Sequence, residues 1–223
     1  MSARAATGAL LAVLAAGLAV TPARAPAAEK PPVTREQALS DIAGQDVEAR
    51  RQAAAWLGDL GVMADAPVLL RALRDPDEVV RGLAEHSVWQ VWSRSGDPHV
   101  DALFEIGVSQ MNQGAPDAAV DTFTAIIARK PDFAEGWNKR ATAYYLMGDL
   151  DLSLHDCDEV MQRNPNHFGA LSGYGLIYVQ RGELTRALEY FERALAINPN
   201  MQGVQQSIDL IQYRLGKEGK RSI

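Results

Sequence analysis

Hydrophobic residues recur along most of this chain at the spacing of helices. Ala53, Trp56, Leu57 and Leu60 fall at i, i+3, i+4 and i+7, so they share one face of a helix. The same spacing predicts helices after Asp65 and after Asp77, six more over about 101–197, and a last one over about 202–215. Long β-branched runs are absent and alanine is abundant, which also favours helix. The pattern predicts an all-α fold.

A 34-residue interval runs through residues 100–199. It separates the prolines Pro131, Pro165 and Pro199, and also the glycines Gly114, Gly148 and Gly182. A period of this size marks stacked repeats, so we expect antiparallel helix pairs arranged as an α-α superhelix, or solenoid. Each glycine is expected to end a first helix in the left-handed conformation.

Other repeat positions carry small or capping residues. Gly107, Ala141 and Gly175 are small, so the paired helices can approach closely. Polar residues at two further positions are expected to cap the second helix of each pair and the next first helix: Asp117, Asp151 and Thr185, then Asp132, Asn166 and Asn200.

The three segments resemble tetratricopeptide repeats (TPRs) over 100–133, 134–167 and 168–199. The family pattern combines x-x-Leu-Gly-x-x-Tyr, Ala-x-x-x-Phe and Pro, and the third segment follows it with Tyr174-Gly175, Tyr178, Ala187 and Phe191. Residues 95–200 are also similar to a family of exported bacterial TPR proteins, which implies no particular activity.

The second repeat departs from this pattern at three positions. Arg140 replaces an apolar residue, Ser153 the alanine and Cys157 the phenylalanine. We expect Arg140 to pair with a nearby acid, either Asp156 or Glu135.

Residues 35–94 resemble HEAT-like helical repeats. Arg50 and Arg81 lie 31 residues apart, and the segment from Asp75 to Arg81 is similar to the Asp…Val-Arg turn of that family. The resemblance implies that these arginines reach carboxylates and carbonyls in neighbouring turns. The alternative is a generic helical cap in front of the TPRs, and both interpretations give antiparallel helix pairs.

The ends of the chain have a different character. Arg4, the apolar run 9–20 and Ala23-Arg24-Ala25 predict a signal peptide over 1–25, and a proline-containing linker follows over 26–34. The localisation expected from it is periplasmic or secreted; an uncleaved segment would instead act as a membrane tether. At the other end we expect a capping helix over 200–216 and a solvated basic tail over 217–223.

Composition narrows the possible chemistry. The net charge of −6 gives no general attraction to nucleic acid, and the single Cys157 excludes an intrachain disulfide or a multi-cysteine metal cluster. His155 and Cys157 are adjacent in sequence to acids, but neighbouring helical residues point about 100° apart and cannot converge on one ion. Cys157 also occupies a core repeat position. We therefore predict no catalytic residue, metal or cofactor.

The predicted binding surface follows from the resemblance to TPRs, in which the first helix of each pair lines a concave groove. Eight groove residues are expected to contact a partner: Phe104, Val108, Met111, Asn138, Thr142, Tyr145, Ser172 and Leu176. Equivalent positions hold Asp101, Glu135, Gly169 and Val179. The set is apolar with a few amides and hydroxyls, which favours an extended or helical peptide. Alternatively, these residues pack against the N-terminal helices and bind nothing. Trp89 is expected either to line a surface or to dock onto the first TPR helix.

Three functional hypotheses follow. The favoured one is a non-enzymatic adaptor of the bacterial cell envelope that binds a protein or peptide in its groove. The second is a membrane-anchored assembly factor, and the third a thiol- or metal-dependent enzyme that uses His155 and Cys157.

Overall fold

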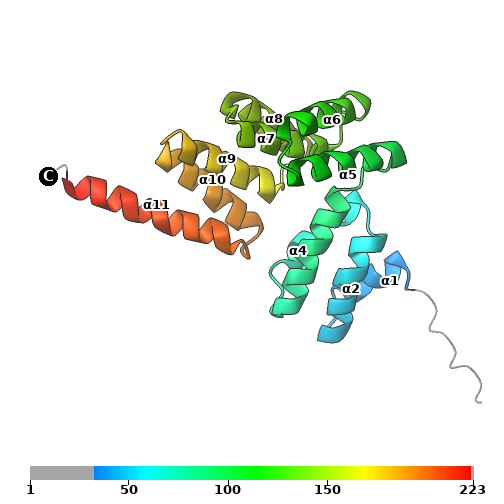
Figure 1. Ribbon diagram of the computed structural model, residues 1–223. Coiled ribbons are helices and arrows are strands. Elements are labelled where there is room, and N and C mark those ends of the chain that lie inside the picture. Colours follow the sequence, from blue (N-terminus) through cyan, green and yellow to red (C-terminus); the bar gives the residue numbers. More distant parts are fainter. Residues whose placement is uncertain (1–32, 222–223) are drawn as a thin grey trace, which may run out of the picture. The chain divides into compact units, whose positions relative to one another are not determined.

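The computed structural model describes residues 33–221, with side chains through Lys217. Within this range the chain forms helices and no strand, and it belongs to one compact unit that begins at Val33 (Figure 1). The all-α prediction is confirmed. The proposed signal peptide and residues 26–32 of the linker lie outside the described residues. None of the described helices is long and apolar enough to cross a membrane.

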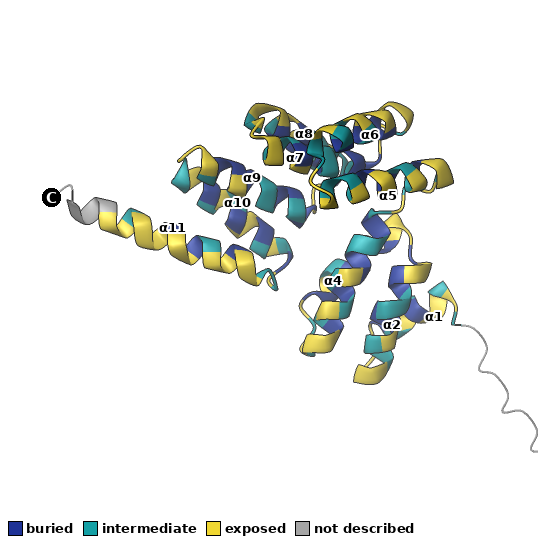
Figure 2. Cartoon of the chain, viewed as in Figure 1, coloured by how far each residue is buried: buried dark blue, intermediate teal, exposed yellow. Residues whose placement is uncertain are grey.

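The N-terminal block contains four helices and a short 3-10 turn. They are α1 (Arg35–Asp41), α2 (Val47–Leu60), the 3-10 turn Met63–Asp65, α3 (Ala66–Ala72) and α4 (Glu78–Trp92). Asp77 accepts a hydrogen bond from the Val80 amide (3.0 Å) and caps α4. The α2 and α4 helices pack together, and Figure 2 shows their facing sides buried.

Gly61 ends α2 in an extended conformation. Its φ of −70° and ψ of 156° differ from the left-handed conformation in which a glycine commonly ends a helix. Its amide still donates to the Leu57 carbonyl, and the chain continues extended into the 3-10 turn, which removes the need for a reversal at Gly61.

Two arginines join the turns of the N-terminal block. Arg50 binds the Asp75 carboxylate through Nε and Nη2 (2.8 and 3.1 Å) and also donates to the Gln45 carbonyl. Arg81 donates to the carbonyls of Asp75 and Pro76. These are carboxylate and carbonyl contacts of the kind that the resemblance implied.

Seven further helices follow in sequential order. They are α5 (Pro98–Asn112), α6 (Pro116–Arg129), α7 (Ala134–Met147), α8 (Leu150–Arg163), α9 (Phe168–Gln180), α10 (Leu184–Ile197) and α11 (Gln202–Arg221). Each helix packs on the next one along the chain. Gly114, Gly148 and Gly182 adopt φ of +74°, +85° and +76°, which confirms the predicted stops.

The predicted caps of the repeat helices are wrong. Helices α6, α8 and α10 begin one residue earlier than Asp117, Asp151 and Thr185, which therefore lie inside the first turn, and no side chain caps these helices. The single residue between each left-handed glycine and its helix, Ala115, Asp149 or Glu183, occupies the N-cap position instead. Asp132 and Asn166 do not cap either: Phe133 and His167 occupy the N-cap positions.

The α11 helix covers the end of the repeats. Val204, Ile208 and Ile211 are buried in the core shared with α9 and α10. The helix continues to Arg221, so residues 217–221 of the expected basic tail are helical.

The N-terminal block packs against the third repeat. Phe168 of α9 is fully buried in the N-terminal core, and Trp89 lies edge-on to it (5.1 Å between ring centroids). Trp89 also covers Gly169. The expectation that Trp89 docks onto the first TPR helix is therefore wrong, because the glycine of α9 offers a flat surface that an indole can approach.

Polar contacts extend this junction to the end of α10. Arg74 donates to the carbonyls of Ala196 and Ile197, and the Asn200 amide donates to the Leu73 carbonyl (2.8 Å). Arg81 reaches the Asn200 oxygen (3.1 Å). Asn200 thus joins the two blocks, and it does not cap α11 as predicted: it lies two residues before that helix begins.

Candidate functional site

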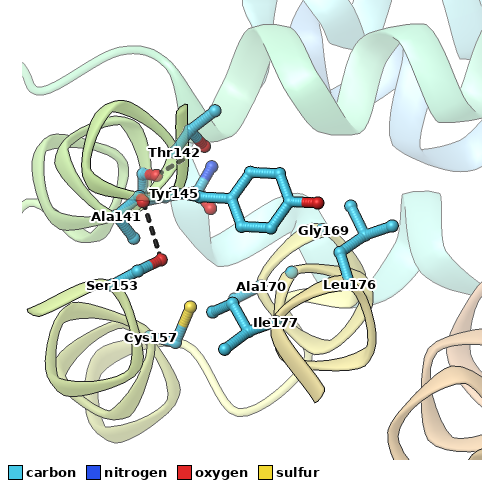
Figure 3. A pocket seen from close by; sticks show the side chains of 11 residues that line it. Ala141, Thr142, Tyr145, Ser153, Cys157, Gly169, Ala170, Leu176 and Ile177 are labelled. Atoms are coloured by element: carbon cyan, nitrogen blue, oxygen red, sulfur yellow. Dashed lines mark hydrogen bonds between the residues drawn. The ribbon is translucent and has the colours of Figure 1, made fainter. Parts of the chain in front are cut away.

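A hollow between α7, α8 and α9 contains four of the predicted groove residues. Asn138, Thr142, Tyr145 and Leu176 line it, together with residues outside the eight predicted groove positions: Ala141, Ser153, Cys157, Gly169, Ala170, Gly173 and Ile177 (Figure 3). Three helices from two successive repeats thus form one concave site.

The lining is mostly apolar and made of small side chains. Figure 3 shows the Tyr145 ring extending across the hollow toward Leu176, with the Cys157 sulfur and Ile177 on the other side. The Ser153 hydroxyl donates to the Ala141 carbonyl (2.8 Å), and the Thr142 hydroxyl to the Asn138 carbonyl (3.0 Å). Because both hydroxyl protons are used internally, the hollow suits an apolar group.

The hollow arises where the second repeat departs from the repeat pattern. In the first and third repeats, Phe123 and Phe191 lie against the glycines Gly107 and Gly175 and fill the space between paired helices. The second repeat has Cys157 at this position, and a thiol is much smaller than a phenyl ring. The departure at Cys157 is therefore the sequence signal for the hollow, although the repeat position by itself predicts a core residue.

Other predicted groove residues lie elsewhere. Phe104 is only 4% exposed, and its ring packs against Phe123 and Phe133 (centroids 6.0 and 5.5 Å apart). Val108 and Met111 pack against the same cluster. The expectation that Phe104 lines an accessible groove is therefore wrong, because its ring fills the space between α5, α6 and the start of α7.

The N-terminal block covers part of the remaining surface. Trp89 lies on Gly169, and Glu85 of α4 lines a second hollow with Ser172 and Leu176. Packing against the N-terminal helices, which we considered as an alternative, thus occurs around Gly169. Thr142 remains exposed and Leu176 is 41% exposed, so the α7–α8–α9 hollow stays open.

A buried polar cluster lies beside this covered region. His167 is fully buried and its Nδ1 accepts from the Ala170 amide (3.0 Å), so Nε2 carries the hydrogen and donates to Glu135 (2.5 Å). Asn138 donates to the other Glu135 oxygen (3.0 Å). Burial raises the pKa of Glu135, but His167, Lys139 and Asn138 outweigh it, so this pKa lies below its ordinary value.

This cluster was not predicted from the sequence. Glu135 is 1% exposed although it occupies an outward-facing TPR position, and its carboxylate binds the buried His167. Trp92 of α4 stacks on the His167 ring (4.6 Å, 22°).

Arg140 forms the predicted ion pair. Its Nε and Nη2 bind the two oxygens of Asp156 at 2.7 and 2.9 Å, and Asp156 is nearly fully buried. Of the two acids expected as partners, the structure selects Asp156. The ion pair neutralises the charge that Arg140 brings to a repeat position where the family pattern has an apolar side chain.

His155 and Cys157 do not share a site. The His155 side chain is 64% exposed and contacts Asp156, whereas Cys157 lies in the core at 3% exposure. Burial, with the charges of Asp156 and Asp158, raises the pKa of the Cys157 thiol to about 12. Among the described residues no group of three or more His, Cys, Asp or Glu side chains is arranged to hold a metal ion.

Sequence comparisons agree with the repeat organisation. Two protein-family models, both described as tetratricopeptide repeat, match residues 101–132 and 132–200. A TPR repeat-containing protein of Rhizobium etli is 32% identical over 146 residues, which cover 66% of this chain and 71% of that protein.

Two solved structures show the same fold. The first TPR of Spaghetti (RPAP3), bound to the HSP90 peptide SRMEEVD, has a TM-score of 0.51 and 25% identity over 52% of this chain and 93% of that one. MamA covers 78% of this chain and 86% of its own, with a TM-score of 0.50 and 18% identity, a likeness of fold alone. With its three 34-residue helix pairs and a relative matched over most of its length, the chain belongs to the tetratricopeptide-repeat proteins.

Proposed function

We propose that this protein is a non-enzymatic adaptor that binds a peptide segment of another protein along α7 and α9. The hollow at Cys157 carries this proposal, because it is an accessible apolar recess on the surface that TPR domains use for peptides. The similar RPAP3 domain, which holds an HSP90 peptide, supports the same class of partner.

The peptide is expected to place one apolar side chain in the hollow. Small lining residues such as Ala141 and Gly173 leave room for it, and Tyr145 and Leu176 would cover its edges. The backbone of an extended or helical segment would then pass over the exposed Thr142.

Export to the cell envelope is part of the proposal. Its support is the sequence pattern of residues 1–25, and the HEAT-like resemblance of residues 35–94 would make the N-terminal block a second helical repeat unit. N-terminal sequencing of the mature protein distinguishes a cleaved signal from a membrane tether: a start near residue 26 supports export, and an intact N-terminus supports the anchored assembly factor.

Variants that fill the hollow or remove part of its lining test the binding site. Peptides from a displayed library are selected on the wild type, and their affinity is then measured for Cys157→Leu and Tyr145→Ala. We expect a loss of about ten-fold or more, since a buried apolar anchor contributes on the order of 1.5–3 kcal/mol. Far-ultraviolet circular dichroism should show unchanged helix content.

Leu152→Ala provides the matched control. Leu152 is 50% exposed on α8 and does not line the hollow, so its loss should leave the affinity unchanged. Equal affinity of wild type, Cys157→Leu and Tyr145→Ala would refute the assignment of the hollow.

A further inference from the structure

A different hollow lies where the N-terminal block meets the loops that precede α7 and α9. Trp92 and Arg94 line it from the N-terminal side, and Lys130, Phe133 and Asn164 from the loops. Its volume is about 190 Å³, and it is partly open to solvent. It shares no residue with the α7–α8–α9 hollow.

The charged residues around this hollow are mainly basic. Arg94, Lys130 and Arg163 line it, and Asp132 is its one acidic lining residue. Lys130 is paired with Asp132 (3.4 Å) and Arg163 with Glu159 (2.6 Å). Arg94 instead donates to the carbonyls of the α2 C-terminus, and within the described residues no carboxylate pairs with it.

The N-terminus of a 14-residue helix opens into the same space. Phe133 and Ala134, the N-cap and first residue of α7, both line the hollow, and no side chain caps this helix. The first amides of a helix lack intrahelical acceptors and carry partial positive charge, which favours an anion.

Two buried hydrogen-bond donors belong to the lining. Trp92 is 4% exposed and Asn164 is 5% exposed, and within the described residues neither the Trp92 Nε1–H nor the Asn164 Nδ2 group finds an acceptor. Asn198, one repeat later, has the same unpaired amide. Asn164 alone therefore does not mark a site; its combination with the Trp92 indole, the Arg94 charge and the α7 N-terminus does.

We propose that the hollow beside Trp92 binds an oxyanion, a carboxylate or a phosphate group, between Trp92, Lys130, Asn164 and the N-terminus of α7. An oxyanion supplies several acceptor oxygens and negative charge together, which is what unpaired N–H donors beside basic side chains require. The site is independent of the peptide-binding hollow.

Nuclear magnetic resonance of the ¹⁵N-labelled full chain tests the site directly. Sodium phosphate and sodium acetate are titrated separately, each against sodium chloride at matched ionic strength. We expect saturable shifts of the Trp92 indole N–H, assigned with a Trp92→Phe variant, and none of the Trp56 indole, which is not part of the hollow. A response to phosphate alone identifies a phosphate site, and a response to acetate alone a carboxylate site.

The most specific comparison uses two variants, each of which replaces a side-chain amide donor by a carboxylate oxygen. Asn164→Asp keeps the oxygen that accepts from the Asn166 amide but replaces the unpaired donor with a carboxylate oxygen. It should weaken anion binding about ten-fold or more, the usual range for a hydrogen bond to a charged group. Asn198→Asp makes the same change at the equivalent repeat position outside the hollow and should leave affinity within about two-fold, since no donor to the anion is lost there.

Lys130→Gln tests the charge without touching a buried residue, with Lys217→Gln on α11 as its control. The first should weaken binding and the second should not. Unchanged indole shifts with both salts, or equal affinities of the Asn164→Asp and Asn198→Asp variants, would overturn the proposal.

Discussion

At the residue scale, single small side chains decide how closely paired helices approach. A Cβ atom at Gly175 would lie 2.3 Å from the Phe191 ring, and one at Gly107 would lie 2.6 Å from Phe123. These distances are far below van der Waals contact, so α9 could not keep its position against α10 if Gly175 carried a side chain. The repeat position thus requires glycine wherever its partner is phenylalanine.

The first prediction concerns this packing. Gly175→Ala should lower the free energy of unfolding by about 1–3 kcal/mol, the usual cost of overpacking a core, and Gly175→Leu by more. Gly82→Ala on α4 is the matched control, because a Cβ there meets no atom within 4 Å and alanine favours helix. Urea denaturation measures both; equal stability of the two alanine variants would contradict the argument.

A second residue-scale prediction concerns pH. The pKa of Glu135 lies below its ordinary value of 4.5, so its carboxylate stabilises the fold above that pH, and this stabilisation is lost as the pH falls through the folded-state pKa. Glu135→Gln should therefore cost about 1–3 kcal/mol at pH 7, because a buried hydrogen-bond acceptor is replaced by a donor.

Denaturation at several pH values checks this expectation. The difference in stability between wild type and Glu135→Gln should be full at pH 7 and should shrink below the ordinary carboxyl pKa. Glu192→Gln, at an exposed position of α10, should show no such difference. A constant difference down to the most acidic condition would show that the charge of Glu135 does not contribute.

At the element scale, α4 is the helix that joins the N-terminal block to the repeats. Its Trp89 lies on Gly169 and Phe168, and its Trp92 stacks on His167. Phe168 in turn completes the core of the N-terminal block. A few large side chains thus make the junction, and the stability of α4 depends on them.

Removing one of them gives the third prediction. Trp89→Ala should increase amide hydrogen exchange in α2 and α4 by about ten-fold or more, because these helices lose part of their packing. Trp137→Ala removes an indole from the other side of α7, where it contacts Arg140 and Arg163, and should leave exchange in α4 unchanged. Equal protection of α4 in the two variants would refute a role of Trp89 in docking.

At the scale of the whole molecule, contacts between residues more than 100 positions apart link the N-terminal block to the end of the repeats. Arg74 and Arg81 make these contacts with residues 196–200. In a simple solenoid each unit contacts only its neighbours along the chain, and its ends can unfold independently. Here the additional contacts should make residues 33–217 unfold together.

The fourth prediction follows from this coupling. In the wild type, tryptophan fluorescence, which is dominated by Trp56, Trp89 and Trp92 of the N-terminal block, should change at the same urea concentration as circular dichroism. In the double variant Arg74→Ala with Arg81→Ala, the fluorescence transition should move to lower urea. Arg193→Ala, within α10, should keep the two transitions coincident. Coincident transitions in the double variant would contradict the coupling.

The helices of this protein could be predicted from local features of its sequence. Helical spacing, the 34-residue interval and glycines such as Gly148 depend on local backbone preferences, so they could be interpreted without knowing any contact. The Arg140–Asp156 pair was also predictable, because a charged residue at a core position requires a partner from the facing helix. The N-cap positions could not be predicted in this way, because a shift of one residue in the start of a helix moves Asp117 from the N-cap into the first turn.

Which groove positions are buried and which border a hollow depends on tertiary packing. Phe104 and Tyr145 are both predicted groove residues of first repeat helices, yet Phe104 is buried and Tyr145 borders a hollow. The difference comes from distant residues: the phenylalanines around Phe104 fill their space, and Cys157 leaves space beside Tyr145. Likewise, Trp92 of α4 stacks on His167, whose partner Glu135 lies 32 residues earlier, and no periodicity of the sequence specifies such contacts.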